Sequence, residues 1–352
     1  MSANPVAAPP VRVLVVDDSA FMRFTISKHL NETPGIVVVG SARDGREALN
    51  LIPELQPDVI TLDVEMPRLD GLSTLREIMA KFPRPVIMLS SLTTEGAVET
   101  VQALTLGAVD FVAKPAFKAN IDSILGEVAE KVLRASKAKV WGLSKATSAP
   151  PRPQTAEKKV RALLQHEKVV VIGSSTGGPR ALNTVIPQLP PNLPAAVVIV
   201  QHMPAGFTRS LAERLDAASK ISVKEAEPGD ELVAGRCLMA PGGFHLLLDT
   251  QGKFTLNQNP PVHGVRPAVD VTMLSIAQRY KERVVGVILT GMGNDGTNGA
   301  GLVHGSGGWV IAEAEQTCVV WGMPRSVTEA GFANEVVPLP QIADAIVRAV
   351  EN

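Results

Sequence analysis

The sequence has few cysteines and no marked excess of charge of either sign. Cys237 and Cys318 are its only cysteines in 352 residues. They are too few for a disulfide framework and do not have the spacing of a metal-binding motif, and the composition fits a reducing cytoplasm. The formal net charge of −1 gives no electrostatic reason to bind nucleic acid or an anionic membrane. We therefore expect no nucleic-acid partner and no DNA-binding output domain.

Long apolar runs are also missing from the sequence. No run reaches the roughly 18 residues of a membrane span, and the start, MSANPVAAPP, lacks the charged and apolar regions of a signal peptide. We expect residues 1–10 to be a disordered tail and the protein to be cytoplasmic, without direct membrane insertion. With 45% apolar and 20% charged residues, the chain is long enough for two or three ordinary globular domains.

Residues 11–135 alternate short β-branched runs with helix-like stretches. This pattern predicts an α/β domain with a five-stranded parallel sheet. The expected strands are residues 11–16, 36–40, 59–62, 85–89 and 108–112. Ligands of such sheets bind at the carboxyl ends of the strands.

Polar side chains gather at these expected strand ends, namely Asp17, Asp18, Asp63, Ser90 and Lys114. Three carboxylates at one edge suit Mg²⁺, which binds hard oxygen ligands together with a phosphate. A carboxylate beside the metal could attack a phosphoryl group, and the hydroxyl and amine could pair with the oxygens of the acyl phosphate. The alternative interpretation is that the aspartates only cap the following helix and that the lysine lies on the surface.

This part of the chain resembles the receiver domain of response regulators, because LVVDDS, DVEMPRLDG, LSS and FVAKP follow that family's order and spacing. The resemblance implies a flavodoxin-like fold in which Asp63 is the phosphoacceptor and Asp17, Asp18 and Asp63 hold Mg²⁺. It also implies three switch positions: the hydroxyl of Ser90, the aromatic ring of Phe111 and the phosphoryl contact Lys114.

Residues 136–165 are polar and rich in proline, which predicts a flexible linker between two domains. Trp141 is its one large aromatic residue, and we expect that side chain to pack against a neighbouring surface. Residues 166–352 then predict a second, larger doubly wound α/β domain. Its expected strands are residues 169–172, 196–201, 284–289 and 309–312, with an inserted hairpin within 236–256.

Polar residues again follow the strands of the second domain. Ser175 lies in the sequence GSSTG, which satisfies the nucleophile-elbow pattern G-x-S-x-G. His202 and Asp295 each come directly after or close to another expected strand. A serine hydroxyl attacks a carbonyl only when a base takes its proton and a third group orients that base. Each residue taken singly has an ordinary structural explanation, but their joint placement predicts a catalytic triad.

A rival interpretation comes from the glycines around Asp295. Gly291, Gly293 and Gly296 form a literal G-x-G-x-x-G, and Glu313 stands near the end of the next strand, where a ribose-binding acid belongs in a dinucleotide site. The negative charge of Asp295 would oppose a pyrophosphate at the helix start.

Five segments, GSSTGGP, VQHMPAGFTRSLAERL, APGGFH, VRPAVD and LTGMGNDG, follow the receiver in this order. The chain thereby resembles the chemotaxis response regulator protein-glutamate methylesterases. The resemblance implies Ser175 as nucleophile, His202 as general base and acid, and Asp295 as the residue that orients His202. It implies the backbone N–H groups of Thr176 and Met292 as oxyanion donors.

The implied reaction is hydrolysis of glutamyl methyl esters on a chemoreceptor's cytoplasmic region, with deamidation of receptor glutamines as a second activity. It needs no cofactor, and a chemotaxis histidine kinase would phosphorylate the receiver. Ser174 stands where the family more often has alanine and is not the matching nucleophile; His245, His263 and His304 match no catalytic position, so we expect them to be structural. The competing hypothesis is a phosphorylation-regulated binding module whose second domain performs no chemistry.

Overall fold

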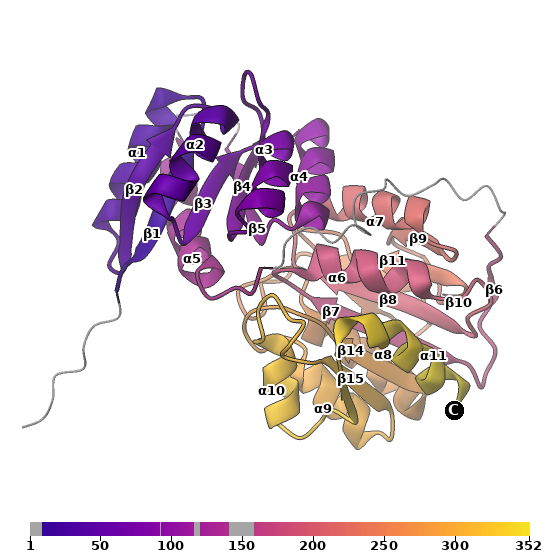
Figure 1. The fold of residues 1–352 in the computed structure, drawn as a ribbon. Helices are drawn as coiled ribbons and strands as arrows, with labels where there is room; N and C mark the ends of the chain where they lie inside the picture. The colour runs from indigo at the N-terminus through magenta and orange to yellow at the C-terminus, as the bar shows by residue number, and fades with distance from the viewer. Residues whose placement is uncertain (1–8, 92, 116–119, 141–157) are drawn as a thin grey trace, which may run out of the picture. The chain divides into compact units, whose positions relative to one another are not determined.

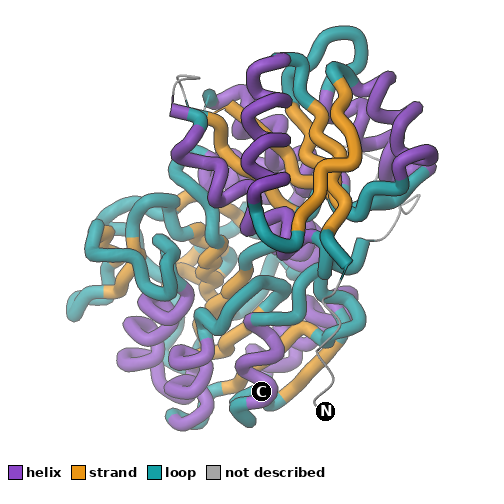
Figure 2. Tube along the Cα trace, turned by 90° about the vertical axis from the view of Figure 1, so that its left-hand side faces the viewer, coloured by secondary structure: helices purple, strands orange, loops and turns teal. Residues whose placement is uncertain are grey.

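The structure, a computed structural model, describes residues 9–91, 93–115, 120–140 and 158–352. Trp141 and the first eight residues of the expected tail lie outside these ranges. The chain divides into two compact units, Met1–Ser148 and Ala149–Asn352. Each unit is built on a parallel sheet with helices packed against it (Figure 1, Figure 2).

The N-terminal unit is a five-stranded sheet in the order β2-β1-β3-β4-β5, and each neighbouring pair is parallel, as predicted. Its strands are β1 (Val11–Val16), β2 (Ile36–Ala42), β3 (Val59–Asp63), β4 (Val86–Ser91) and β5 (Asp110–Lys114). Its helices are α1 (Ala20–Glu32), α2 (Gly45–Leu55), α3 (Gly71–Lys81), α4 (Thr94–Leu106) and α5 (Asp122–Ala135). Every residue of β3 is buried, as expected for a central parallel strand with helices on both faces.

Two strands of this unit are displaced from the predicted ranges. The strand predicted at 108–112 is β5, because Gly107 ends α4 in a left-handed conformation with φ 116° and the next two residues form the connection. The strand predicted at 85–89 extends through Ser91. Ser90 and Lys114, and likewise Asp63 at the end of β3, therefore lie within the last residues of their strands rather than after them.

The C-terminal unit holds a seven-stranded sheet in the order β16-β15-β14-β7-β8-β11-β9, in which all neighbours are parallel. Its strands are β7 (Lys168–Ser174), β8 (Ala195–Gln201), β9 (Ser222–Glu225), β11 (Arg236–Met239), β14 (Val284–Ile288), β15 (Trp309–Glu313) and β16 (Glu335–Val337). Its α-helices are α6 (Gly178–Val185), α7 (Phe207–Ala218), α8 (Val269–Tyr280), α9 (Thr297–Gly305), α10 (Met323–Glu329) and α11 (Ile342–Glu351), and the short 3₁₀ helices are η2 (Ile186–Gln188), η3 (Lys281–Arg283) and η4 (Leu339–Gln341).

Strand β7 is the switch point of this sheet, where the order in which successive strands are added reverses. The next strand along the chain, β8, pairs with one edge of β7, whereas β14 returns to pair with the other edge. Side chains on both faces of β7 are buried, including the run Val169–Ile172. Open α/β sheets bind ligands at the carboxyl ends of the strands beside such a switch point, so the ends of β14, β7 and β8 are the place to look for a site.

Two short antiparallel pairs lie outside the main sheet. The inserted hairpin consists of β12 (His245–Leu248) and β13 (Phe254–Asn257), but β11, which the sequence pattern had assigned to that hairpin, joins the main sheet instead. Strand β6 (Arg161–Ala162), within the expected linker, pairs with β10 (Val233–Ala234). The last residues of that linker therefore belong to the C-terminal unit.

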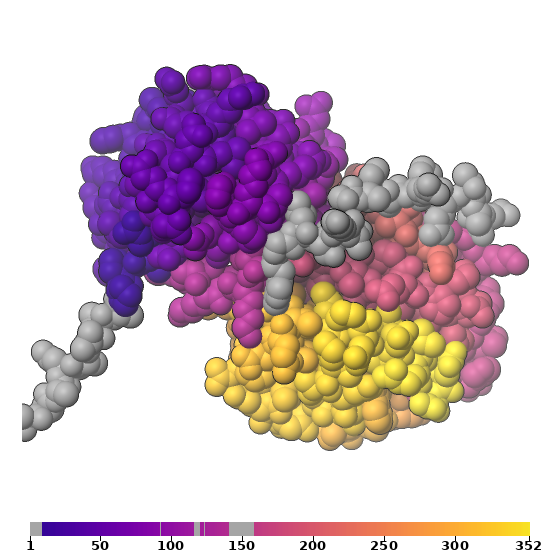
Figure 3. Space-filling model, in the orientation of Figure 1, coloured from indigo at the N-terminus to yellow at the C-terminus, as the bar shows by residue number. Residues whose placement is uncertain are grey.

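The C-terminal quarter of the chain, coloured orange to yellow, forms a continuous part of this unit's surface (Figure 3). Among the residues that the structure describes, no helix is both long enough and apolar enough to cross a membrane.

Candidate active site

Ser175 lies in the tight turn that joins β7 to α6. The Gly178 N–H donates to the Ser175 carbonyl over 2.8 Å, and Gly177 has φ 80° and ψ −8°, which are the values of the third residue of a type II turn. A side chain at Gly177 would also approach Val319 Cβ to 2.6 Å. Gly177 is therefore required by the turn, and Ser175 is left half-buried at the carboxyl end of β7.

Backbone hydrogen bonds join the ends of the three central strands. The His202 N–H donates to the Ser174 carbonyl over 3.1 Å, and the Ser175 N–H donates to the Thr290 carbonyl over 3.0 Å. These two hydrogen bonds hold the residues that follow β7, β8 and β14 next to one another, at the carboxyl ends of the strands.

His202 and Asp295 are in direct contact at this edge. Nε2 of His202 lies 2.8 Å from Oδ2 of Asp295, and their side chains are only 9% and 3% exposed. Burial by itself would raise the pKa of Asp295, but the hydrogen bond and charge of His202 and the backbone N–H groups of Asp270 and Val269 hold that pKa below its usual range. Asp295 thus stays ionised and fixes Nε2 of the imidazole, which leaves Nδ1 for a second partner.

A second histidine–aspartate pair adjoins the first and was not expected from the sequence. Nε2 of His263 lies 2.9 Å from Oδ2 of Asp270, and Asp270 is 2% exposed. His263, Asp270 and Asp295 offer ligand-type atoms within 4.8 Å of one another. Both carboxylates already accept backbone N–H groups at the starts of α8 and α9, so we interpret the group as a hydrogen-bonded support. The only sequence signal for this pair was the segment VRPAVD, whose aspartate is Asp270.

The loop after β14 approaches the serine closely. A side chain at Gly291 would lie 2.8 Å from Ser175 Cβ, and the following residue, Met292, is 44% exposed. The Gly291 carbonyl accepts two N–H groups, from Gly322 over 3.0 Å and from Met323 over 2.8 Å. These contacts fix the orientation of the Gly291–Met292 peptide.

Glu313 lies behind this loop and has no surface exposure. Its Oε2 accepts the Thr290 N–H over 2.8 Å, and burial raises its pKa above the ordinary value. The acid that a dinucleotide site would need on its surface is therefore inside the protein, which removes the support for that alternative.

His245 and His304 have structural contacts, in line with the sequence-based expectation. His245 is buried, with Nε2 3.2 Å from the Pro260 carbonyl oxygen, and the His304 ring packs at a tilt against Phe332.

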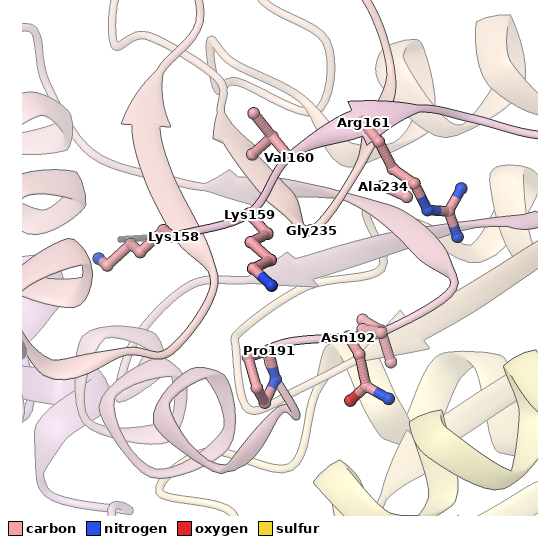
Figure 4. Close-up of a pocket in the computed structure, with 9 residues that line it drawn as sticks. Lys158, Lys159, Val160, Arg161, Pro191, Asn192, Ala234 and Gly235 are labelled. Atoms are coloured by element: carbon pink, nitrogen blue, oxygen red, sulfur yellow. The ribbon is translucent and has the colours of Figure 1, made fainter. Parts of the chain in front are cut away.

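A pocket of about 590 Å³ lies elsewhere in the C-terminal unit, beside β6 (Figure 4). It is lined by Lys158, Lys159, Val160, Arg161, Pro191, Asn192, Leu193, Ala234 and Gly235. None of Ser175, His202 or Asp295 contributes to it, so this pocket is separate from the candidate triad.

In the N-terminal unit, Lys114 joins two buried carboxylates. Its Nζ lies 2.8 Å from Oδ2 of Asp17 and 2.7 Å from Oδ2 of Asp63. Burial raises the pKa of Asp63 to about 7, Lys114 opposes this rise and Asp17 adds to it. Carboxylate oxygens of Asp17, Asp18 and Asp63 lie within 4.8 Å of one another. Three hard oxygen donors at this spacing fit Mg²⁺, whose charge would favour the ionised form of each.

Two further receiver residues lie inside the same unit. Ser90 is fully buried and its hydroxyl donates to the Gly96 carbonyl over 3.0 Å. The Phe111 ring is 4% exposed, and Nζ of Lys131 lies 5.2 Å from its centroid. Both predicted switch side chains therefore have inward positions here.

Comparison with known proteins agrees with this geometry. Two family models match the chain, the CheB methylesterase model over residues 170–346 and the response regulator receiver domain model over residues 13–125. A curated protein-glutamate methylesterase/protein-glutamine glutaminase of Symbiobacterium thermophilum is 54% identical over 352 residues, which cover 97% of each chain. The chain belongs to the CheB methylesterase family.

Other CheB relatives resemble the chain to a similar degree. The curated protein of the same name from Geobacillus kaustophilus is 51% identical over 97% of this chain and 99% of its own. A crystal structure of the Thermotoga maritima CheB methylesterase catalytic domain matches with a TM-score of 0.51 at 54% identity, covering 52% of this chain and 98% of that one. The similarity to CheB thus extends through both units.

Proposed function

We propose that this chain is a phosphorylation-regulated protein-glutamate methylesterase, which also deamidates receptor glutamines, and that Ser175, His202 and Asp295 are its catalytic residues. The observation that supports this assignment most directly is the 2.8 Å contact between His202 Nε2 and Asp295 Oδ2 at the strand ends that hold Ser175. Relatives with the same two-domain pattern carry the methylesterase/glutaminase name.

The proposed reaction begins with proton transfer from the Ser175 hydroxyl to Nδ1 of His202, while Asp295 holds the opposite ring nitrogen. The serine oxygen attacks the ester carbonyl carbon, and the N–H groups of Thr176 and Met292 stabilise the resulting oxyanion. Methanol leaves with the proton from His202, and water then hydrolyses the glutamyl–serine ester to glutamate. A glutamine side chain follows the same route with ammonia as the leaving group.

The N-terminal unit supplies the proposed control of this reaction. Asp63 would accept a phosphoryl group from a chemotaxis histidine kinase in the cytoplasm, and Asp17, Asp18 and Asp63 would hold Mg²⁺, which supplies positive charge for the incoming phosphate. Lys114 and Ser90 would then contact the phosphoryl oxygens, with Phe111 responding by a change of packing. The substrate partner is a methylated chemoreceptor cytoplasmic region.

The test is methanol release from a methylated receptor fragment, with and without a small phosphodonor plus Mg²⁺. We expect release by the wild type to rise with phosphodonor, to vanish in Ser175→Ala, and to lose its phosphodonor dependence in Asp63→Asn. Ser174→Ala is the matched control for the nucleophile and should retain turnover within about fivefold, because that serine is buried. Equal release by Ser175→Ala and wild type would contradict the assignment.

A further inference from the structure

The turn that carries Ser175 rests on a buried glutamine at the end of the neighbouring strand. Gln201 is 2% exposed, and its Nε2 donates to the Ser175 carbonyl over 3.0 Å and to the His202 carbonyl over 3.2 Å. Its Oε1 accepts the Ser174 hydroxyl over 2.7 Å. One side-chain amide thus contacts the backbone of both the proposed nucleophile and the proposed base.

Two backbone carbonyl oxygens determine which way this amide faces. They can only accept, so the –NH₂ group of Gln201 must face them, and Oε1 is left to accept the Ser174 hydroxyl. The space around the amide is closed, since a side chain at Gly178 would overlap Oε1. Ser174 and Gly178 therefore hold Gln201 in one orientation.

The Ser175 carbonyl and the Thr176 N–H belong to the same trans peptide, in which the two groups point in opposite directions. Donors on the carbonyl therefore fix the direction of the N–H. Building on the function proposed above, we propose that Gln201, oriented by Ser174, is a positioning residue that aims the Thr176 N–H at the developing oxyanion and keeps Ser175 in register with His202.

The Met292 N–H, the second proposed oxyanion donor, also belongs to a peptide whose carbonyl accepts two hydrogen bonds. The carbonyl of the Ser175–Thr176 peptide accepts two donors, Gly178 N–H and Gln201 Nε2, and the carbonyl of the Gly291–Met292 peptide also accepts two, from Gly322 and Met323. Three of these four donors are backbone N–H groups, which an ordinary change of side chain leaves in place. Gln201 is the member of the set whose role can be tested.

The first test replaces Gln201 by methionine, which has a similar length and no donor. We expect kcat for methanol release to fall roughly 10- to 100-fold, somewhat less than the loss of a whole oxyanion donor, with KM within twofold of wild type. The affinity for a glutamyl boronate, whose tetrahedral oxygen occupies the oxyanion position, should fall in parallel with kcat. Gln188→Met makes the same chemical change at an exposed position and should leave both quantities unchanged.

The second test asks whether Ser174 acts through Gln201. Ser174→Ala should lower kcat about two- to fivefold without changing KM. The double variant Ser174→Ala with Gln201→Met should have the kcat of Gln201→Met alone, because without the Gln201 amide the Ser174 hydroxyl has no group to orient. If Gln201→Met fails to fold, the Ser174→Ala result decides: a parallel loss of kcat and boronate affinity supports the proposal.

Wild-type kcat in either Ser174→Ala or folded Gln201→Met would overturn the proposal, as would additive losses in the double variant or a loss confined to KM. These outcomes require an active wild type and an inactive Ser175→Ala. Failure of the esterase assignment itself would instead appear as no difference between those two proteins.

Discussion

Asp295 and Asp270 cap the starts of each other's helices. Asp295, which precedes α9, accepts the N–H groups of Val269 and Asp270 at the start of α8. Asp270, in the first turn of α8, accepts the Gly299 N–H at the start of α9 over 2.8 Å. Each carboxylate lies where the helix dipole favours negative charge. The reciprocal contacts join two helices that are distant in sequence and fix the residue that holds His202.

We predict that Asp270→Asn lowers both stability and turnover. An amide at this position keeps the size but places –NH₂ against one of the donors that the carboxylate now accepts, so we expect a loss of about 1–3 kcal/mol in the free energy of unfolding. Turnover should fall because Asp295 is held less firmly. Urea unfolding and methanol release measure the two effects. Asp344→Asn, in the exposed first turn of α11, is the control, and an equal effect of both substitutions would contradict the reciprocal role.

We predict that Asp295→Asn lowers kcat by about 10⁴-fold, since the imidazole of His202 would lose the carboxylate that selects its tautomer and stabilises its protonated form. KM should change little, because Asp295 is buried. Steady-state methanol release gives both constants. A variant that keeps more than a tenth of wild-type kcat would exclude Asp295 from the orienting role.

The pH dependence of stability should reveal the buried Glu313. Because burial raises its pKa above the ordinary value of 4.5, the folded state keeps a proton that the unfolded state releases. The contribution of this group to the free energy of unfolding therefore declines as the pH rises from 4.5 through the folded-state pKa.

Glu313→Gln removes that dependence, so the Tm of the variant relative to wild type should be higher at pH 8 than at pH 5. Glu329→Gln, on an exposed side chain of α10, should show a nearly constant difference. Thermal unfolding at the two pH values measures both, and a Glu313→Gln difference that does not change with pH would contradict the raised pKa.

We expect Gly178→Ala to be far more damaging than Gly305→Ala. A Cβ at Gly178 would overlap the Gln201 amide, whereas a Cβ at Gly305 meets nothing within 4 Å. The first substitution should reduce kcat at least tenfold by displacing the Ser175 turn. The second should be neutral or stabilise helix α9 by up to about 1 kcal/mol. Turnover and Tm of the two variants, measured side by side, decide this comparison.

Much of the architecture could be predicted because buried parallel strands leave a strong sequence signal. The β-branched runs located β7, β8, β14 and the receiver strands, and the residues after them contained the candidate triad. Short strands were harder. Strand β9 and strand β16 have only a few residues, and β11 was assigned to the hairpin because alternating runs of four residues fit either partner.

The supporting residues of the site could not be predicted from spacing. Asp270 and Asp295 meet only because α8 and α9 pack together, and nothing in the local sequence of either residue specifies that contact. Gln201 was equally inconspicuous, since a polar residue at a strand end is ordinarily solvated. Here the neighbouring Ser174 and the absence of a side chain at Gly178 enclose it.

The central position of β7 also has a consequence for the order of events during synthesis. Its two sheet neighbours are β8, which follows at once, and β14, which is made much later. A nascent chain that already contains Ser175 and His202 still lacks Asp295 and the Gly291–Met292 loop. The proposed catalytic site can therefore be completed only late in synthesis, after the whole of the unit proposed to regulate it has been made.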